Sequence, residues 1–191
     1  MPLILASSSP YRRAVLAKAG FQFRCQSPAI DETAQPGEAA AELVKRLAQE
    51  KARAVATPYA AALIVGSDQV CECDGIILGK PGTRENAIRQ LEFVSGKVAA
   101  LRTGIALLNT ASDRCQTGLD CCEVAYRKLS RGQIEEYVDA EQPFDCCGSL
   151  RAEGPGIRLL KRITGNDPNT LVGLPLIMLI DMLENENYPG G

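Results

Sequence analysis

The fold is decided by the opening stretch Leu3-Ile-Leu-Ala-Ser-Ser-Ser-Pro-Tyr-Arg-Arg13, in which a strand-like run gives way to a helix. The first four of these residues form a short apolar run that is typical of a buried strand. Ser9 suits the N-cap of a helix, Pro10 suits its first position, and Gly20 suits the position just after its end. The stretch therefore predicts a strand that is followed at once by a helix.

The rest of the chain continues this alternation. Apolar patterns predict strands over residues 21–25, 63–65 and 157–163, a hairpin over 70–78 that turns at Asp74-Gly75, and a long antiparallel pair over 98–109 and 116–126. Helical patterns cover residues 38–57, 83–94 and 130–140, and Pro175 opens a terminal helix. Alternating strands and helices around one long hairpin favour the α/β class, with a mixed, twisted sheet flanked by helices.

The composition is that of a soluble globular domain. Of the 191 residues, 46% are hydrophobic and 23% are charged. The formal net charge of -2 lacks the basic excess of proteins that bind polymeric nucleic acids, so no such partner is expected. No apolar run approaches the length of a membrane span, and no basic segment precedes the run at 3–6, so neither a membrane partner nor a signal peptide is expected.

The absence of histidine restricts the chemistry that the chain can perform. It excludes His-based acid–base catalysis and every His-containing metal site, so any catalysis must use carboxylates, Lys, Arg, Tyr, Ser or Cys. The eight cysteines include no C-x-x-C pair, which is the usual zinc-binding spacing. We expect buried, reduced thiols and therefore a reducing compartment, the cytoplasm.

Several basic side chains follow patterns that suit phosphate binding. The turn from Ser7 into the first helix offers backbone N–H groups, and Arg12 and Arg13 add positive charge in the first helical turn. Lys80 is flanked by a glycine and a proline, which restrict its reach, and Lys51 lies in the middle of a predicted helix. A solvated helix start and ordinary exposed lysines remain the alternatives.

Acidic side chains complete the inventory. Asp68 follows the strand predicted at 63–65, so we expect it at the carboxyl edge of the sheet, where α/β proteins bind ligands. Asp31 and Glu32 lie in a loop bounded by prolines. A turn-forming aspartate and a solvated loop are the alternatives. Carboxylates and basic groups at the ends of elements together favour metal-assisted phosphoryl chemistry.

A series of short motifs runs through nearly the whole chain: Ala6-Ser-x-Ser-Pro-x-Arg12-Arg13, Asp31-Glu32, Ala48-Gln-Glu-Lys51-Ala52, Gly66-Ser-Asp68-Gln-Val70, Gly79-Lys-Pro81, Ser95-Gly96 and Gly173-Leu-Pro175. In this order they resemble the Maf family of nucleotide pyrophosphatases. The resemblance implies one Maf-like domain over residues 1–191, an elongated α/β fold with two lobes around a central cleft, and a homodimer.

The resemblance also implies a reaction, the hydrolysis of a nucleoside triphosphate to the monophosphate and pyrophosphate. Asp68 is then the proton acceptor. Glu32 and Asp68 are expected to hold Mg²⁺ or Mn²⁺, with Asp31 as an auxiliary ligand, because oxygen ligands suit hard cations. The residues expected to bind the triphosphate are Ser7, Arg12, Lys51 and Lys80.

Three further positions divide the family by substrate, and here they hold Tyr11, Gln69 and Glu153. This combination resembles the 7-methyl-GTP pyrophosphatase branch. A 7-methylguanine base is cationic, so Tyr11 can stack on it by cation–π attraction, and Glu153 can accept hydrogen bonds from its N1–H and amine. For Gln69 we expect a contact with a base-edge carbonyl.

Two other functions remain open from the sequence. One is a non-catalytic nucleotide-binding regulator of cell division, or septum formation, although the intact set of Asp68, Glu32, Lys51 and Lys80 argues against pure binding. The other is a phosphatase that removes terminal phosphates. The product distinguishes it, because this phosphatase releases orthophosphate instead of pyrophosphate.

Overall fold

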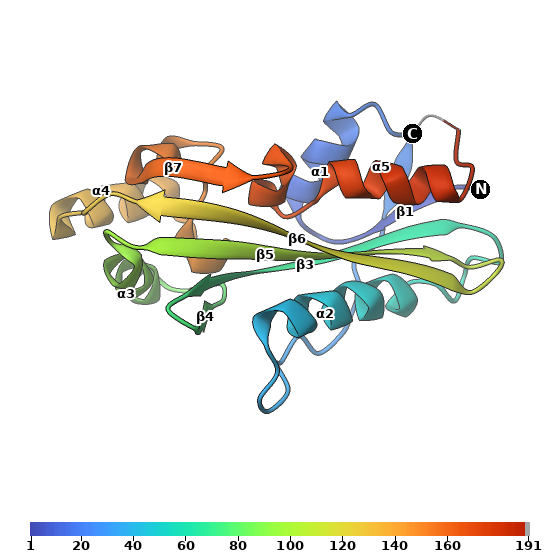
Figure 1. The fold of residues 1–191 in the computed structure, drawn as a ribbon, viewed down its shortest axis with the longest axis horizontal. Helices are drawn as coiled ribbons and strands as arrows, with labels where there is room; N and C mark the ends of the chain where they lie inside the picture. The colour runs from blue at the N-terminus through green and yellow to red at the C-terminus, as the bar shows by residue number, and fades with distance from the viewer. Residues whose placement is uncertain (190–191) are drawn as a thin grey trace. The chain divides into compact units, whose positions relative to one another are not determined.

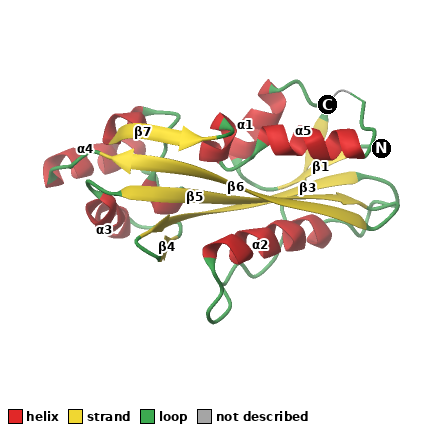
Figure 2. Cartoon of the chain, viewed as in Figure 1, coloured by secondary structure: helices red, strands yellow, loops and turns green. Residues whose placement is uncertain are grey.

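The computed structural model describes residues 1–189, and a mixed sheet of seven strands organises this part of the chain (Figures 1 and 2). In chain order the strands are β1 (Leu3–Ala6), β2 (Phe23–Cys25), β3 (Leu63–Cys73), β4 (Ile76–Leu78), β5 (Val98–Asn109), β6 (Arg114–Tyr126) and β7 (Leu160–Gly165). They are arranged in the order β2-β1-β3-β5-β6-β7, with β4 paired to β3 outside this path. β1 is parallel to β2 and β3, whereas β4 and β7 are antiparallel to β3 and β6. The expected α/β class with a mixed sheet is confirmed.

Helices fill most of the connections between strands. They are α1 (Pro10–Lys18), α2 (Ala40–Ala54), α3 (Arg84–Val94), α4 (Arg131–Glu141) and α5 (Leu176–Asn185), with the short 3₁₀ helices η1 (Cys147–Ser149), η2 (Pro155–Leu159) and η3 (Pro168–Val172). Ser9, Thr83 and Ser130 cap α1, α3 and α4, because each side chain accepts a backbone N–H from the first turn. Within residues 1–189, none of the helices has the length and apolar character needed to cross a membrane.

The described residues divide into two compact units. The first unit contains residues 1–69, 103–120 and those from 167 onwards, and the second contains residues 70–102 and 121–166. Strands β3, β5 and β6 contribute residues to both units. In the second unit, α3 contacts both α4 and η1.

In the first unit, helices cover both faces of the sheet (Figure 1). Leu3 of β1 packs in a cluster with Leu16 of α1 and Leu183 of α5. The next residue, Ile4, packs in another cluster with Ala52 of α2. Successive strand residues point to opposite faces, so β1 supplies both clusters from only four residues. The expected flanking of the sheet by helices is confirmed.

Two glycines allow α2 to lie close to the sheet. A Cβ at Gly66 of β3 would lie 2.0 Å from the carbonyl oxygen of Ala48, and a Cβ at Gly104 of β5 would lie 2.1 Å from that of Val44. Both oxygens belong to the backbone of α2, which cannot move aside as the end of a flexible side chain can. The absence of side chains at Gly66 and Gly104 therefore sets the distance between α2 and these strands.

Two predicted strand boundaries are wrong. The sequence predicts that the strand at 63–65 ends at residues 66–68, but β3 continues to Cys73, so Asp68 lies within a strand, two residues beyond Gly66, where the pairing of β3 with the parallel strand β1 ends. Gly66, Ser67 and Asp68 are typical turn residues, but here Gly66 makes room for α2, and the other two have buried partners. Near the C-terminus, residues 157–159 belong to η2, and the strand begins only at Leu160.

The substitution Gly66→Ala should lower the free energy of unfolding by about 1–3 kcal/mol, because the new Cβ would force α2 to shift. For a chain of this size, this corresponds to a melting temperature lower by about 2–12 °C. Gly132→Ala in α4 is the control, since its Cβ would meet nothing within 4 Å, and it should be neutral or slightly stabilising. Scanning calorimetry measures both, and equal melting temperatures would contradict the close packing of α2.

Candidate active site

A buried lysine joins two of the predicted acidic residues. The Lys51 ammonium Nζ lies 2.5 Å from Asp68 Oδ1 and 2.8 Å from Glu32 Oε1. Lys51 and Asp68 are only 5% and 6% exposed, whereas the side chain of Glu32 is half exposed. Lys51 is therefore not the ordinary exposed lysine that its place in a helix suggests. The structure brings Lys51, Glu32 and Asp68 together.

The close approach of α2 explains how Lys51 reaches Asp68. A Cβ at Gly66 would face Ala48 and Ala52 of α2. Asp68 is two residues further along β3, so its side chain points to the same face of the sheet. Lys51 immediately precedes Ala52 on α2 and meets Asp68 there. The motif Gly66-Ser-Asp68 and the motif around Lys51 therefore form one local structure.

The Asp68 carboxylate has one oxygen that the protein leaves open. Oδ1 accepts the hydrogen bond from Lys51, and no group within residues 1–189 donates a hydrogen bond to Oδ2.

Asp31 is not part of this cluster. Its Oδ1 accepts a hydrogen bond from the backbone N–H of Thr33 at 2.9 Å, and hydrogen bonding by Thr33 lowers the pKa of Asp31.

Ser7 and Arg12 form a second group, at the start of α1. Ser7 Oγ accepts hydrogen bonds from the backbone N–H of Ser9 at 3.1 Å and from Arg12 Nη1 at 3.5 Å. Arg12 Nε donates to the carbonyl oxygen of Gly173 at 2.7 Å, which fixes the guanidinium close to Ser7. Two of the residues predicted to bind phosphate are therefore held side by side.

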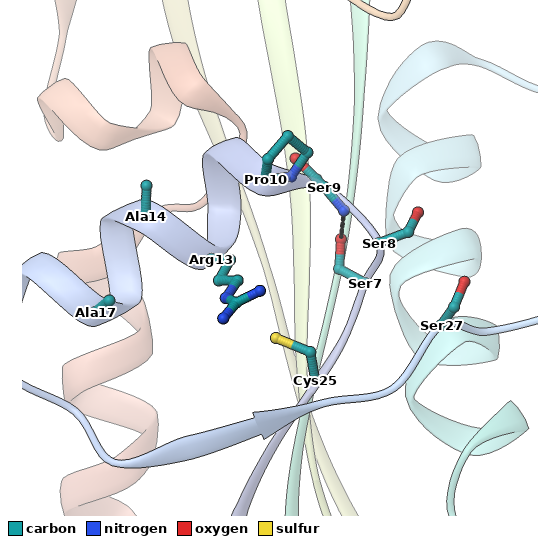
Figure 3. Close-up of a pocket in the computed structure, with 9 residues that line it drawn as sticks. All are labelled: Ser7, Ser8, Ser9, Pro10, Arg13, Ala14, Ala17, Cys25 and Ser27. Carbon is teal, nitrogen blue, oxygen red and sulfur yellow. Dashed lines mark hydrogen bonds between the residues drawn. The ribbon is translucent and has the colours of Figure 1, made fainter.

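A pocket of about 510 Å³ opens beside this group (Figure 3). Four serines, Arg13 and Cys25 contribute to its lining. In Figure 3 the Arg13 side chain extends from α1 toward Cys25, on the strand β2. The pocket thus combines hydroxyl groups and a guanidinium at a helix N-terminus, a combination that suits anions.

Gln69 is held from inside the first unit, by contacts that the sequence does not reveal. Its amide Nε2 donates to Thr103 Oγ1 at 2.8 Å and to the carbonyl oxygen of Thr170 at 2.6 Å. The expected contact with a base-edge carbonyl would require Gln69 to give up one of these bonds, because that contact also needs an amide N–H. Tyr11, in the first turn of α1, is half-buried.

Lys80 and Glu153 belong to the second unit, and both are exposed. The carbonyl oxygen of Gly79 accepts hydrogen bonds from the backbone N–H of Gly148 and the side chain of Gln90, so the backbone next to Lys80 is fixed. Glu153 lies in a turn that precedes η2. Their expected roles stay predictions.

None of the eight cysteines, all of which lie within residues 1–189, forms a disulfide bond. Cys71, Cys73 and Cys122 are buried, whereas Cys25 is exposed, so the expectation of buried thiols holds only in part. Burial raises the pKa of Cys71, which makes its thiolate rare at neutral pH. Over residues 1–189, no three His, Cys, Asp or Glu side chains gather as a metal-binding group.

Comparison with known proteins agrees with the motifs. A family model described as Maf-like protein matches residues 2–186. The chain is also 50% identical over 185 residues to a protein of Idiomarina loihiensis named 7-methyl-GTP pyrophosphatase, and the match covers 96% of this chain and 93% of that protein.

The buried ion pair gives a stability prediction. Lys51→Met leaves the Asp68 carboxylate buried without its cation, so it should lower the free energy of unfolding by about 3–5 kcal/mol. Adding Asp68→Asn removes the uncompensated charge, and the double variant should recover about 1–3 kcal/mol.

Urea denaturation at neutral pH measures these differences. The control is Lys45→Met, also in α2, whose lysine forms a more exposed ion pair with Glu42 and should contribute less than about 1 kcal/mol. If the double variant were no more stable than Lys51→Met alone, the pairing of Lys51 with Asp68 would not account for the loss.

Proposed function

The chain belongs to the Maf-like family, and on that premise we propose that it hydrolyses 7-methyl-GTP to 7-methyl-GMP and pyrophosphate. The observation that carries the chemistry is the buried Asp68 carboxylate, of which one oxygen is paired to Lys51 and the other has no hydrogen-bond donor among residues 1–189. The substrate follows from the near full-length similarity to the Idiomarina loihiensis protein and from the side chains at positions 11, 69 and 153.

Asp68 acts as the general base in this proposal. A water molecule placed at Oδ2 gives its proton to the carboxylate while its oxygen attacks the α-phosphorus. The bond from the α-phosphorus to the bridging oxygen breaks, and pyrophosphate leaves. Lys51 holds Oδ1, so the carboxylate cannot turn its open oxygen away from the water.

Charge develops on the pyrophosphate leaving group, and basic side chains stabilise it. The residues that we assign to the triphosphate are Ser7, Arg12, Lys51 and Lys80. The Arg12 guanidinium is already oriented by the Gly173 carbonyl oxygen, so little reorganisation is needed when the phosphate arrives. A fixed guanidinium can also bind two phosphate oxygens at once.

We propose that Glu32 and Asp68 would hold a divalent cation, Mg²⁺ or Mn²⁺, when it enters with the substrate. The donor set fits such a cation, since Mg²⁺ is commonly bound by one or two carboxylates plus substrate phosphates. A cation held in this way neutralises charge on the triphosphate. Lys51 bridges the same two carboxylates, so it keeps them close together.

The base would be recognised by its charge and its donors. Tyr11 stacks on the cationic 7-methylguanine ring, and Glu153 accepts hydrogen bonds from N1–H and the exocyclic amine. The cytoplasm is the compartment that we propose, because a chain with eight cysteines and no C-x-x-C pair suits a reducing environment. A homodimer remains a prediction from the family resemblance.

Pyrophosphate release tests the reaction. With Mg²⁺ or Mn²⁺ present, the wild-type protein should convert 7-methyl-GTP to 7-methyl-GMP and pyrophosphate, and EDTA should abolish turnover. Asp68→Asn should lower kcat by about 10²–10⁴-fold, because the general base is lost. Coupled pyrophosphate and orthophosphate assays distinguish the products. Orthophosphate as the first product, or undiminished turnover by Asp68→Asn, would overturn the mechanism.

Glu153→Gln tests the recognition of the base. The variant keeps the size and one acceptor but removes the charge, so kcat/KM for 7-methyl-GTP should fall by about 5–150-fold, or 1–3 kcal/mol. The values for dTTP should change little, because dTTP carries no cationic base. Glu136→Gln, at an exposed position in α4, is the matched control and should leave all values unchanged. An equal loss for 7-methyl-GTP, GTP and dTTP would mean that Glu153 has a general role.

A further inference from the structure

The Gln69 amide has a fixed orientation. Nε2 lies 2.6 Å from the carbonyl oxygen of Thr170, which can only accept a hydrogen bond. The end of the amide that faces Thr170 must therefore be the nitrogen, and the hydrogen-bond network settles which end is which. The second amide hydrogen is directed to Thr103 Oγ1 at 2.8 Å. Oε1 consequently points away from both partners.

The amide oxygen lies close to the group proposed to bind phosphate. A Cβ at Gly173 would lie 3.5 Å from Gln69 Oε1 and 3.3 Å from Arg12 Nε. Both side chains therefore border the same face of Gly173. An amide oxygen has two lone pairs, so it can accept a hydrogen bond from a ligand in addition to one from the protein.

The two partners of the Gln69 amide are themselves anchored. Thr103 and Thr170 are fully buried, and Asp120 is 8% exposed. The Thr170 hydroxyl donates to Asp120 Oδ2, and Thr103 Oγ1 lies 3.4 Å from the Thr170 carbonyl oxygen. Buried polar groups whose hydrogen bonds are satisfied are rigid, so they define one position for the amide.

We propose that Thr103 is a positioning residue for base selection: its hydroxyl, together with the Thr170 carbonyl, holds Gln69 so that this side chain meets the nucleobase as a hydrogen-bond acceptor. The proposal rests on the function proposed above and makes it more specific. Guanine-type bases offer N1–H and an amine with two hydrogens, so Glu153 can accept from N1–H and one amine hydrogen while Gln69 accepts from the other, whereas thymine and uracil offer one N–H between two carbonyls. An acceptor at Gln69 therefore favours the guanine-type edge.

The experiment compares kcat/KM for 7-methyl-GTP and dTTP. Thr103→Val keeps the shape of the side chain but removes the hydroxyl, so the amide keeps only its hydrogen bond to the Thr170 carbonyl and can pivot about it. The ratio of the two kcat/KM values should fall by about 3–10-fold. Thr103→Ser, which retains the hydroxyl, should restore the ratio. In a Gln69→Ala background, Thr103→Val should not change the ratio further, because the group that it positions is gone.

Gln69→Met provides a second test that leaves Thr103 intact and does not depend on the folding of Thr103→Val. A thioether cannot donate to the Thr170 carbonyl and is only a weak acceptor, so this variant should also lose the preference for 7-methyl-GTP. An equal loss for both substrates in Thr103→Val, or an unchanged ratio in Gln69→Met, would overturn the proposal. Failure of the proposed function itself is seen separately, because the wild-type protein would then release no pyrophosphate from 7-methyl-GTP.

Discussion

The burial of Lys51 beside Asp68 is the constraint on which the candidate site depends. Removing two charges from water costs several kcal/mol for each ion, and the pair persists only because the two groups meet at hydrogen-bonding distance. Glu32, at 2.8 Å from the same ammonium, adds a second carboxylate from a loop that precedes α2. A buried ion pair is weak evidence for stability alone. Its presence is better explained by chemistry that needs a carboxylate in a fixed position.

The ion pair depends in turn on the backbone contact between α2 and the sheet. Gly66 and Gly104 remove the side chains that would otherwise hold α2 away from β3 and β5. With α2 further out, Lys51 would not reach Asp68, and the buried carboxylate would lose its cation. Gly66 and Gly104 therefore support the site by allowing α2 to lie close to the sheet.

The sequence predicted the local structure well, because caps and turns are local. Ser9 and Pro10 open α1, and the hairpin turns at Asp74-Gly75, whose φ angles of 50° and 76° are the left-handed values expected of such a turn. The sequence predicts an end of the strand where β3 in fact continues, because Gly66-Ser-Asp68 has the composition of a turn. The glycine is needed there because α2 packs closely against it, and this contact is not visible in the local sequence. The burial of Lys51 cannot be predicted from the sequence either, because it depends on contacts with distant parts of the chain. The same holds for the two partners of the Gln69 amide, which are 34 and 101 residues away.

The segment 167–177, which contains η3 and the start of α5, connects the side chains that we assign to phosphate binding and to base selection. Its Thr170 carbonyl accepts from Gln69, and its Gly173 carbonyl accepts from Arg12, three residues later. Asp167 fixes both ends of the segment, because its carboxylate accepts from the backbone N–H of Asn169 at 2.8 Å and from that of Ile177 at 2.7 Å. A displacement of this segment would therefore move the guanidinium and the amide together. In this arrangement a poorly matched base would disturb the group that orients the phosphates, so discrimination between bases should affect kcat as well as KM.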